Sequence, residues 1–390
     1  MTTTYTLYQP AMAAGGGSAA PGGNDTLPPE ISVQGGKFTC RHQWLDNGPS
    51  RGVDILTIQG ARAGLTLVPT RGMAIWKAWC GETTYGWQSP VQGPVHPALV
   101  PTDEPSGLGW LAGFDELLTR CGLESNGAPE FDESGRVRYP LHGRLGNTPA
   151  QSLQIIVDAQ QGTLEVRGVV RESRLFFTHW KLTSTIRLQV DSNIIEIEDS
   201  VTNEGDAENT HQLLYHINVG HPVLGAGARL FAPYETVVPK TPRAVEGIKT
   251  FDQYDAPEPG FAEQVYLMRL QADPQGWSGA VLRDAGNQCG LGVRFDTSTL
   301  PYFIQWKNTG GQHDGYVTGL EPATNFPNRR SFEEAQGRVV KVPAGESVNY
   351  RLQLHLLNDS QQLFAFTDQL SSLATHEGKV EWNMRDNWCE

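Results

Sequence analysis

Residues 152–173 read SLQIIVDAQQGTLEVRGVVRES, and residues 180–206 read WKLTSTIRLQVDSNIIEIEDSVTNEGD. Apolar and polar side chains alternate along most of both stretches, and Val, Ile and Thr are frequent in them. Turn signals interrupt the alternation at Gln161-Gly162 and at Asp191-Ser192-Asn193. A period of two with β-branched residues is typical of antiparallel strands that bury one face. These stretches therefore predict half-buried antiparallel strands joined by turns.

Short strand-like runs continue through the chain, and helical patterns are scarce. We expect about two helical turns in GFDELLTRCG, residues 113–122, and a better helix from Ser360 onward. The fold class that follows is all-β, a large antiparallel β-sandwich rather than a solenoid or propeller, because no repeat is apparent. We expect a flexible Gly/Ala/Pro-rich arm at 1–30, one domain at 31–358 and a partly helical tail at 359–390.

Composition and charge exclude several classes of function. The chain has 390 residues and a formal net charge of −13, without basic runs, which argues against nucleic-acid or anionic-membrane binding. No apolar run approaches the ~18 residues of a membrane span, and the N-terminus lacks a signal-peptide pattern. Five scattered cysteines, without a CxxC pair, predict reduced thiols and a cytoplasmic protein. No nucleotide-binding motif is present, and we expect no cofactor and a monomer or homodimer.

Polar or charged side chains occur in three segments that otherwise look like apolar strands. YPLHGRLGNTPA, residues 139–150, contains His142 and Arg144. LLYHINVGHP, residues 213–222, contains His216 and Asn218. GLEPATNFPN, residues 319–328, contains Glu321 and Asn325. Taken singly, each histidine could equally be a hydrogen-bonded core residue, and the glutamate could equally be a surface carboxylate, rather than part of a binding site.

Together, the three segments resemble the aldose 1-epimerase (galactose mutarotase) superfamily. LHGR, YHIN and GLEP are similar to three motifs of that family, in the same order, and VTNEGD at 201–206 resembles one of its turns. The resemblance covers roughly residues 31–358 and indicates a divergent, poorly characterised branch. It implies a galactose mutarotase-like supersandwich that binds a small-molecule sugar without a cofactor. It also implies Glu321 as general base, His216 as general acid and His142 as a positioning group, a combination suited to proton transfer at the anomeric centre.

The chain departs from the family pattern where a neutral sugar would be recognised. Arg144 replaces the second glycine of the first motif, Arg71 lies in PTRGMAIWKAWCG, and residues 230–240 contain no match for the family's substrate-binding aspartate. We expect Arg71, Arg144 and Lys307 to converge on the pocket. Guanidinium and ammonium groups suit anionic ligands. Asn218, Asn325 and Trp306 complete the expected substrate-binding set. The hypothesis is therefore an acidic or modified sugar.

Two other classes of function remain open. His211, His216 and His221 recur every five residues, which raises a metal-assisted lyase or isomerase on the same scaffold. A spacing of five alternates strand faces, however, and neither HExxH nor paired cysteines occur, so we expect no metal. The other alternative is a non-catalytic carbohydrate-binding protein.

Overall fold

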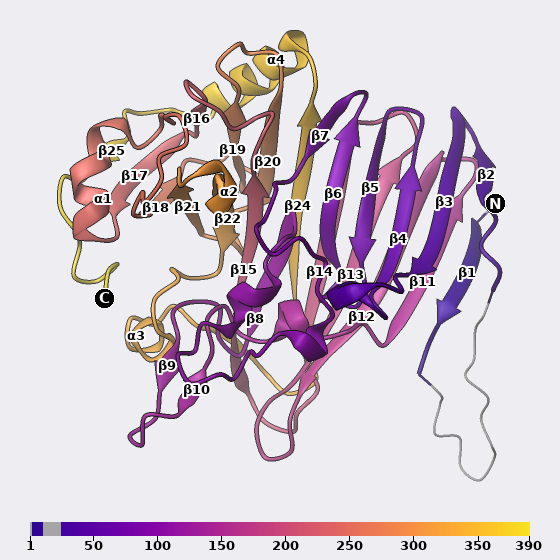
Figure 1. The fold of residues 1–390 in the computed structure, drawn as a ribbon, viewed down its shortest axis with the longest axis horizontal. Helices are drawn as coiled ribbons and strands as arrows, with labels where there is room; N and C mark the ends of the chain where they lie inside the picture. Colours follow the sequence, from indigo (N-terminus) through magenta and orange to yellow (C-terminus); the bar gives the residue numbers. More distant parts are fainter. Residues whose placement is uncertain (1, 11–24) are drawn as a thin grey trace.

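The computed structural model describes residues 2–10 and 25–390, and its two large sheets pack face to face. Figure 1 shows the purple strands of one sheet in front of the pink strands of the other. The first sheet has nine strands, in the spatial order β1 (Thr2–Tyr8), β11 (Ser152–Asp158), β12 (Thr163–Ser173), β13 (His179–Gln189), β14 (Ile194–Asn203), β24 (Ser347–Leu357), β20 (Gly290–Asp296), β19 (Trp277–Arg283) and β16 (Arg229–Phe231).

The second sheet has fourteen strands and supplies the candidate site described below. Its main path is β2 (Glu30–Val33), β3 (Gly36–Trp44), β4 (Asp54–Gln59), β5 (Ala63–Val68), β6 (Ala74–Cys80), β8 (Leu118–Leu123), β15 (Asn209–Val219), β22 (Val317–Ala323), β21 (Tyr302–Asn308), β18 (Gln264–Leu270), β17 (Tyr234–Pro239) and β25 (Lys379–Val380). Off this path, β7 (Thr83–Tyr85) pairs with β6 and β23 (Val340–Val342) pairs with β15, while β9 (Glu130–Phe131) and β10 (Val137–Tyr139) form a separate ribbon. The predicted all-β, largely antiparallel sandwich is confirmed.

Helices are short and lie at the edges and in the connections. The α-helices are α1 (Pro242–Gly247), α2 (Gln312–Gly315), α3 (Arg330–Ala335) and α4 (Ser360–Ser371). Single 3₁₀ turns cover Gly48–Ser50, Pro97–Leu99, Gly109–Gly113, Leu145–Asn147 and Ile248–Thr250. None of the helices in the described part of the chain is long and apolar enough to cross a membrane.

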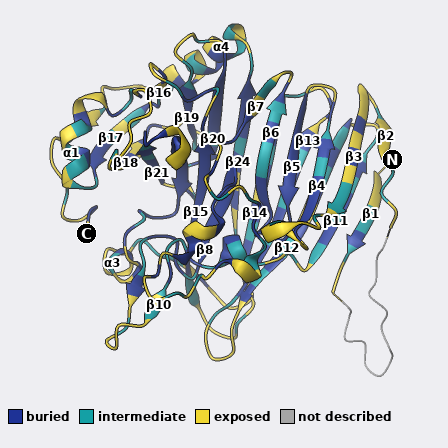
Figure 2. Ribbon diagram, in the orientation of Figure 1, coloured by how far each residue is buried: buried dark blue, intermediate teal, exposed yellow. Residues whose placement is uncertain are grey.

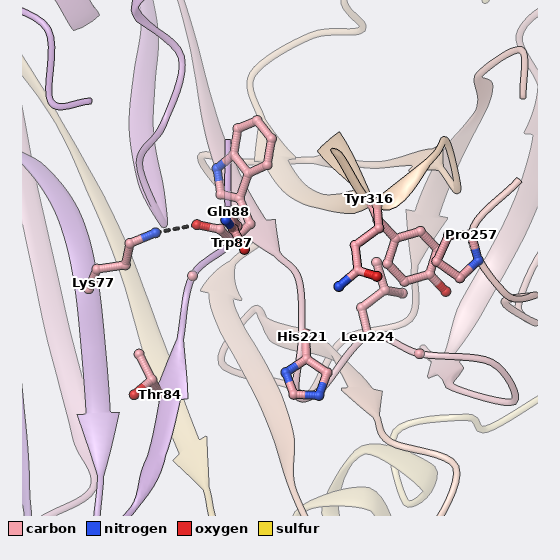
Figure 3. A pocket seen from close by; sticks show the side chains of 11 residues that line it. Lys77, Thr84, Trp87, Gln88, His221, Leu224, Pro257 and Tyr316 are labelled. Atoms are coloured by element: carbon pink, nitrogen blue, oxygen red, sulfur yellow. Dashed lines mark hydrogen bonds between the residues drawn. The ribbon is translucent and has the colours of Figure 1, made fainter. Parts of the chain in front are cut away.

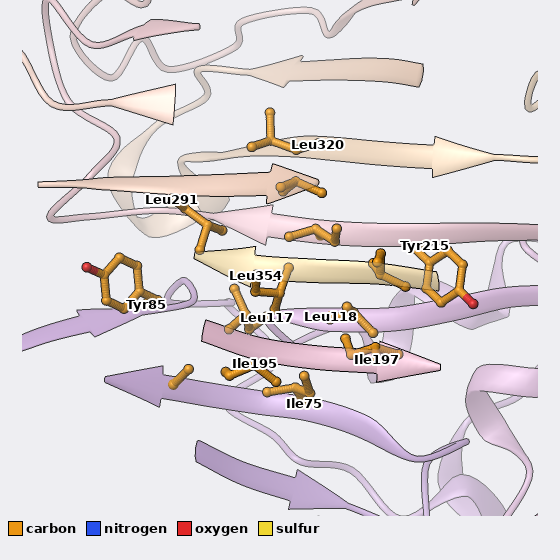
Figure 4. Close-up of a cluster of buried hydrophobic side chains, with 14 of the residues drawn as sticks. Ile75, Tyr85, Leu117, Leu118, Ile195, Ile197, Tyr215, Leu291, Leu320 and Leu354 are labelled. Carbon is orange, nitrogen blue, oxygen red and sulfur yellow. The ribbon is translucent and has the colours of Figure 1, made fainter. Parts of the chain in front are cut away.

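The core between the sheets follows from the period of two. In β13 every second residue from Trp180 to Leu188 is buried, and the intervening side chains reach towards solvent (Figure 2). Ile75 and Leu118 of one sheet meet Ile195 of the other in a single buried cluster (Figure 4). Burial of such side chains contributes about 1.5–3 kcal/mol each, so this layer supplies most of the stability of the fold.

A buried ion pair also joins the two sheets. Arg120 of β8 donates through Nε and Nη2 to both carboxylate oxygens of Asp199 of β14, and Tyr215 Oη of β15 donates to Asp199 Oδ2 over 2.8 Å. Ser184 of β13 accepts a further bond from Arg120, at 2.9 Å. A buried pair tolerates its desolvation only when it is hydrogen-bonded in this way.

Two expectations for local structure are wrong. Residues 2–8 are not part of a flexible arm, because β1 pairs antiparallel with β11 from Thr2 opposite Asp158 onward. The rest of the expected Gly-rich arm, at 11–24, lies outside the described residues. Residues 113–122 are not helical, since β8 begins at Leu118 and pairs with β15. Tertiary pairing overrides the weak helical pattern there. The helix expected from Ser360 is confirmed as α4, which Asp359 caps by accepting from the Gln362 backbone N–H.

Candidate functional site

His216 and Glu321 project from the outer face of the fourteen-stranded sheet. In β15, Tyr215 and Ile217 point into the core between the sheets, so His216 points the opposite way. In β22, Leu320 occupies the same core and Glu321 faces outward. The register pairs Leu214 with Ala323 and Ile217 with Leu320, and it therefore places His216 opposite Glu321 on the neighbouring strand.

The two side chains open into a cavity of about 290 Å³, hereafter the candidate cavity. Its lining comes from β18, β21, β22 and β15, from the segment before β8 and from the loop after β10. The lining residues are Leu108, Trp110, Leu111, Phe114, Ala128, Leu141, His142, His216, Lys240, Glu263, Val265, Ile304, Trp306, Glu321 and Pro327.

The hydrogen bonds around His216 fix its tautomer. Asn218 Nδ2 donates to the carbonyls of Glu116 and His216, so the amide Oδ1 faces the imidazole. His216 Nδ1 lies 2.6 Å from this oxygen and must carry the proton of the bond. The lone pair of Nε2 is therefore free to face Glu321, whose Oε1 is 3.3 Å away.

Burial favours the uncharged form of this pair. Desolvation raises the pKa of Glu321 well above its ordinary value, and nearby Glu263 adds to the effect. Desolvation also lowers the pKa of His216 well below its ordinary value, and His142 acts in the same direction. The pair thus holds one proton between carboxyl and imidazole rather than forming a separated ion pair. Glu321 Oε1 is a buried atom that makes no hydrogen bond with any described residue, so its hydrogen-bonding capacity is not used up by the protein.

His142 is held beside the pair by its backbone conformation and by a hydrogen bond to a neighbouring segment. Its φ of 58° lies in the left-handed region, and the Nδ1–H donates to the carbonyl of Asn126 over 2.9 Å. The rings of His142 and His216 meet edge to face, with centroids 5.2 Å apart. Burial lowers the pKa of His142 to about 4, so a neutral ring presents its Nε2 as an acceptor. A strained residue that is held this firmly is typical of a functional site.

Gly319 leaves the space that the Glu321 carboxyl occupies. A Cβ at this position would lie 2.1 Å from Glu321 Oε1 and 3.2 Å from the Trp306 Cβ. The first distance is far too short for any contact of a Cβ, and the second is tighter than most. The glycine of the GLEP motif is therefore required by the placement of its glutamate.

Aromatic rings surround His216 on several sides. The centroid of Phe114 lies 5.0 Å from the imidazole, that of Trp306 5.4 Å and that of Trp110 6.0 Å. Trp306 is fixed in turn by its Nε1–H, which donates to Glu263 Oε2 over 2.6 Å. Such rings exclude water from the pair and offer flat faces to the C–H groups of a sugar.

The three cations expected in the candidate cavity lie elsewhere, and their predicted convergence is wrong. Arg71 is buried against Glu116 and also donates to Asn147 Oδ1 and to the Gly113 carbonyl. Arg144 pairs with Asp103 over 2.7 Å and with Glu124 over 3.6 Å.

Lys307 points to the opposite face of β21 from Trp306. Its ammonium donates to the carbonyls of Thr250 and Gln253 and lies 5.3 Å from the centre of the Tyr254 ring. All three cations are therefore held by protein groups outside the candidate cavity.

Asn218 and Asn325 support the candidate cavity without lining it. Asn218 is fully buried and orients His216. Asn325 exchanges two amide hydrogen bonds with Asn126, at 2.8 and 2.9 Å, and the Asn126 carbonyl in turn holds His142. The sequence indicated both asparagines as substrate contacts, but in the structure each acts through a histidine.

The other two histidines of the five-residue spacing do not join His216. His211 is buried on the core side of β15, where its Nε2 lies 2.7 Å from Tyr350 Oη. His221 lies beyond β15, on the rim of a different cavity. Among the described residues, no group of three potential ligand side chains is placed to hold a metal ion.

That second cavity, of about 370 Å³, lies on the other side of an aromatic wall. It is lined by Lys77, His221 and Tyr316 among others, and Figure 3 shows Lys77 donating to the Trp87 carbonyl there. Trp87 packs on Phe114 with centroids 4.9 Å apart, and Phe114 lines the candidate cavity. The Trp87 Nε1–H donates to the same Glu116 carbonyl that anchors Asn218. The wall therefore also steadies the support of His216.

Sequence reasoning missed two charged residues of the candidate cavity, Lys240 and Glu263. Lys240 follows β17 and makes no side-chain hydrogen bond or ion pair with any described residue; Glu263 precedes β18 and is exposed. Burial lowers the pKa of Lys240, against the opposing effect of Cys389 and Glu263. Neither residue stands in a recognisable motif, and only the fold brings them to His216.

Comparison with known proteins agrees with this architecture. The family model described as "Domain of unknown function (DUF4432)" matches residues 50–356. A crystal structure of a "putative aldose 1-epimerase" from Klebsiella pneumoniae is 32% identical, with a TM-score of 0.91, and the match covers 99% of each chain.

More distant structures share the fold alone. A galactose mutarotase-like protein from Clostridium acetobutylicum is 13% identical over 82% of this chain and 99% of its own, with a TM-score of 0.56. A "putative aldose 1-epimerase" from Escherichia coli K12 is 15% identical over 78% of this chain and 99% of its own, with a TM-score of 0.51. No curated protein matches the chain significantly. The chain belongs to the DUF4432 family, a divergent branch of the aldose 1-epimerase or galactose mutarotase-like superfamily.

Proposed function

We propose that this protein is an aldose 1-epimerase that interconverts the anomers of a sugar by acid–base catalysis at His216 and Glu321. The observation that supports this most strongly is the distance of 3.3 Å between His216 Nε2 and Glu321 Oε1 in a buried, aromatic-lined cavity. Mutarotation requires one base and one acid, and it ends with the catalyst in its starting protonation state. A pair that holds a single proton meets this requirement without a cofactor.

The chemical steps follow from that proton. In the complex, the proton of Glu321 moves to His216 Nε2, which leaves a carboxylate and an imidazolium. Glu321 removes the proton of the anomeric hydroxyl as the C1–O5 bond breaks and a C1 aldehyde forms. His216 delivers its proton to O5, which becomes a hydroxyl. Rotation about C1–C2 exposes the other face of the aldehyde, and ring closure reverses the two transfers.

The surroundings of the pair match these steps. The bond from Asn218 to Nδ1 leaves Nε2 as the only ring nitrogen that exchanges a proton with the sugar. Neutral His142 accepts a hydrogen bond from a sugar hydroxyl and adds no positive charge that would oppose the imidazolium. Positioned proton transfer of this kind contributes about 10²–10⁴-fold per group.

Exchange NMR of anomeric protons tests the proposal. Purified protein is added to neutral, deoxy, acidic and phosphorylated aldoses, and Glu321→Gln serves as the control. We expect anomer exchange far above the spontaneous rate for at least one sugar, and its loss in the variant. Binding without exchange would favour a carbohydrate-binding protein. Exchange of a carbon-bound proton with solvent deuterium would favour a lyase or isomerase.

A further inference from the structure

The lining of the candidate cavity is mostly apolar. Ten of its fifteen lining residues have aliphatic or aromatic side chains or proline. Apart from the indole N–H groups of Trp110 and Trp306, the polar groups of the lining side chains belong to His142, His216, Lys240, Glu263 and Glu321. Leu108 and Leu111 are 43% and 46% exposed, so apolar surface extends to the solvent-facing part of the cavity. Exposed leucines next to a polar ligand site call for an apolar group on the ligand.

The polar side chains match a sugar with five oxygen atoms rather than six. A hexopyranose has a ring oxygen and five hydroxyls. Glu321 and His216 engage the anomeric hydroxyl and the ring oxygen, while His142, Lys240 and Glu263 are left for three hydroxyls. A sixth oxygen would find no further ionisable side chain in the lining, and a buried hydroxyl without a partner is strongly disfavoured.

The position of the apolar residues indicates which hydroxyl is absent. C6 of a hexose is attached to C5, which is bonded to the ring oxygen, so C6 lies next to the group that protonates that oxygen. Among the apolar neighbours of the catalytic pair, Phe114 and Trp306 lie beside His216, and Ile304 lies directly opposite Glu321 in the β21–β22 register. A methyl group at C6 packs on these side chains. The polar side chains nearest to them are Glu263, which already accepts from the Trp306 Nε1–H, and His142, which is left for another hydroxyl, so a hydroxymethyl group there would have no free partner of its own.

The charges argue against a carboxylate at the same position. Lys240 is the only cationic side chain among the described residues that line the candidate cavity, and Glu263 lines it as well. The cations that would have favoured an anion, Arg71, Arg144 and Lys307, are bound to protein groups elsewhere. A uronate would meet the Glu263 carboxylate and gain a single ammonium.

We propose that the sugar bound in the candidate cavity is a 6-deoxyhexose, with its methyl group against Phe114, Trp306 and Ile304. This inference rests on the proposed function for the orientation of the ring, but it is a statement about binding and can be tested separately. Lys240 and Glu263 then hold ring hydroxyls, and Ile304 contributes to specificity for the methyl group.

Isothermal titration calorimetry on the wild-type protein tests the binding preference, and exchange NMR on the same samples tests the reaction. In each of the galacto, gluco and manno configurations the ligands are the hexose, its 6-deoxy form, the pentose that lacks C6, and the uronic acid. We expect the 6-deoxyhexose of one series to bind at least about tenfold more tightly than its hexose and its pentose, because one methyl group in an apolar pocket is worth that much. A hexose, pentose or uronate that binds as tightly, or no binding in any series, overturns the inference. A 6-deoxyhexose that binds without anomer exchange supports the inference and contradicts the proposed reaction.

A matched pair of variants tests the role of Ile304. Ile304→Val and Ile304→Thr remove similar volume, but only threonine places a hydroxyl beside C6. We expect Ile304→Val to retain the preference for the 6-deoxyhexose over the hexose and Ile304→Thr to reduce it at least about fivefold. Equal preference in the two variants would contradict the placement of the methyl group at Ile304.

Discussion

His216 and Glu321 lie opposite each other on adjacent antiparallel strands, with Nε2 and Oε1 3.3 Å apart. Both side chains point away from the core between the sheets, and both are almost completely buried by the walls of the candidate cavity. Burial of an acid and a base away from water lowers the free energy of unfolding, and the first prediction follows from this cost.

Glu321→Gln is expected to increase the stability of the protein at neutral pH. Burial raises the folded-state pKa of Glu321 above its unfolded value, so its favourable contribution is complete below about pH 4.5 and is lost as the pH rises. Glutamine has nearly the same shape and carries no proton to lose. We expect a gain of about 0.5–2 kcal/mol in the free energy of unfolding at pH 7 to 8, measured by urea denaturation. The gain should disappear at pH 4, and a loss of stability at pH 8 would contradict the buried, protonated carboxyl.

Buried neutral histidines are expected to make the protein sensitive to mild acid. Burial lowers the pKa of His142 to about 4 and those of His211 and His355 to about 3, each from an ordinary value of 6.5. The unfolded chain therefore binds protons that the folded protein does not, and stability falls as the pH drops from about 6.5 to about 4. Each such histidine contributes up to roughly 1.4 kcal/mol per pH unit.

Urea midpoints at pH 7, 6, 5 and 4 measure this effect. His355→Gln is a suitable comparison, because His355 lies far from the candidate cavity, on β24. The variant should lose less stability than the wild type between pH 7 and pH 4. An identical slope in the two proteins would show that His355 is not held neutral.

Gly319→Ala is expected to abolish most of the activity while the protein still folds. The new Cβ would lie 2.1 Å from the present position of Glu321 Oε1, and the end of this side chain is the part that can move. Displacement of a reacting group by about 1 Å costs roughly 10²-fold in rate. Anomer exchange should fall by about that factor, whereas Gly337→Ala, at a site with open space, should retain the wild-type rate. Because Gly337 has a φ of 71°, this control carries a small strain of its own, and both thermal midpoints should be recorded.

Arg71→Met is expected to destabilise the protein instead of changing its substrate preference. It leaves the Glu116 carboxylate buried without its partner, and breaking such a pair costs about 3–5 kcal/mol. The double variant Arg71→Met/Glu116→Gln should recover part of the loss, which a double-mutant cycle in urea measures. A selective loss of affinity for acidic sugars at unchanged stability would restore the original role of Arg71 as an anion-binding residue.

The sandwich could be predicted from the sequence because alternation in β11–β14 directly reports which face of a strand is buried. The grouping of His142, His216 and Glu321 came from three short motifs, since these residues are up to 179 positions apart (321 − 142) and no local pattern connects them. Strand alternation also places Trp306 and Lys307 on opposite faces of β21. The alternation is visible in IQWKN, but the prediction that both residues bind the substrate rested on the charge of the lysine.

Other features could not be read from the sequence. Nothing local reveals that Arg71 finds Glu116 forty-five positions away, because an ion pair of this kind is defined only when the strands are in place. Lys240 and Glu263 enter the candidate cavity from loops, where periodicity gives no direction to a side chain. The short segment at 113–122 looked helical on its own, and only its pairing with β15 makes part of it a strand.

The measurement that tests the central claim most directly is a double-mutant cycle of anomer exchange rates, with wild type, His216→Gln, Glu321→Gln and the double variant compared on the same sugar by exchange NMR. If the two side chains share one catalytic proton, each single variant should lose about 10²–10⁴-fold, and the double variant should lose little more than either. Rates that fall by the product of the two single effects, or a His216→Gln protein that remains fully active, would contradict the pair as the catalyst.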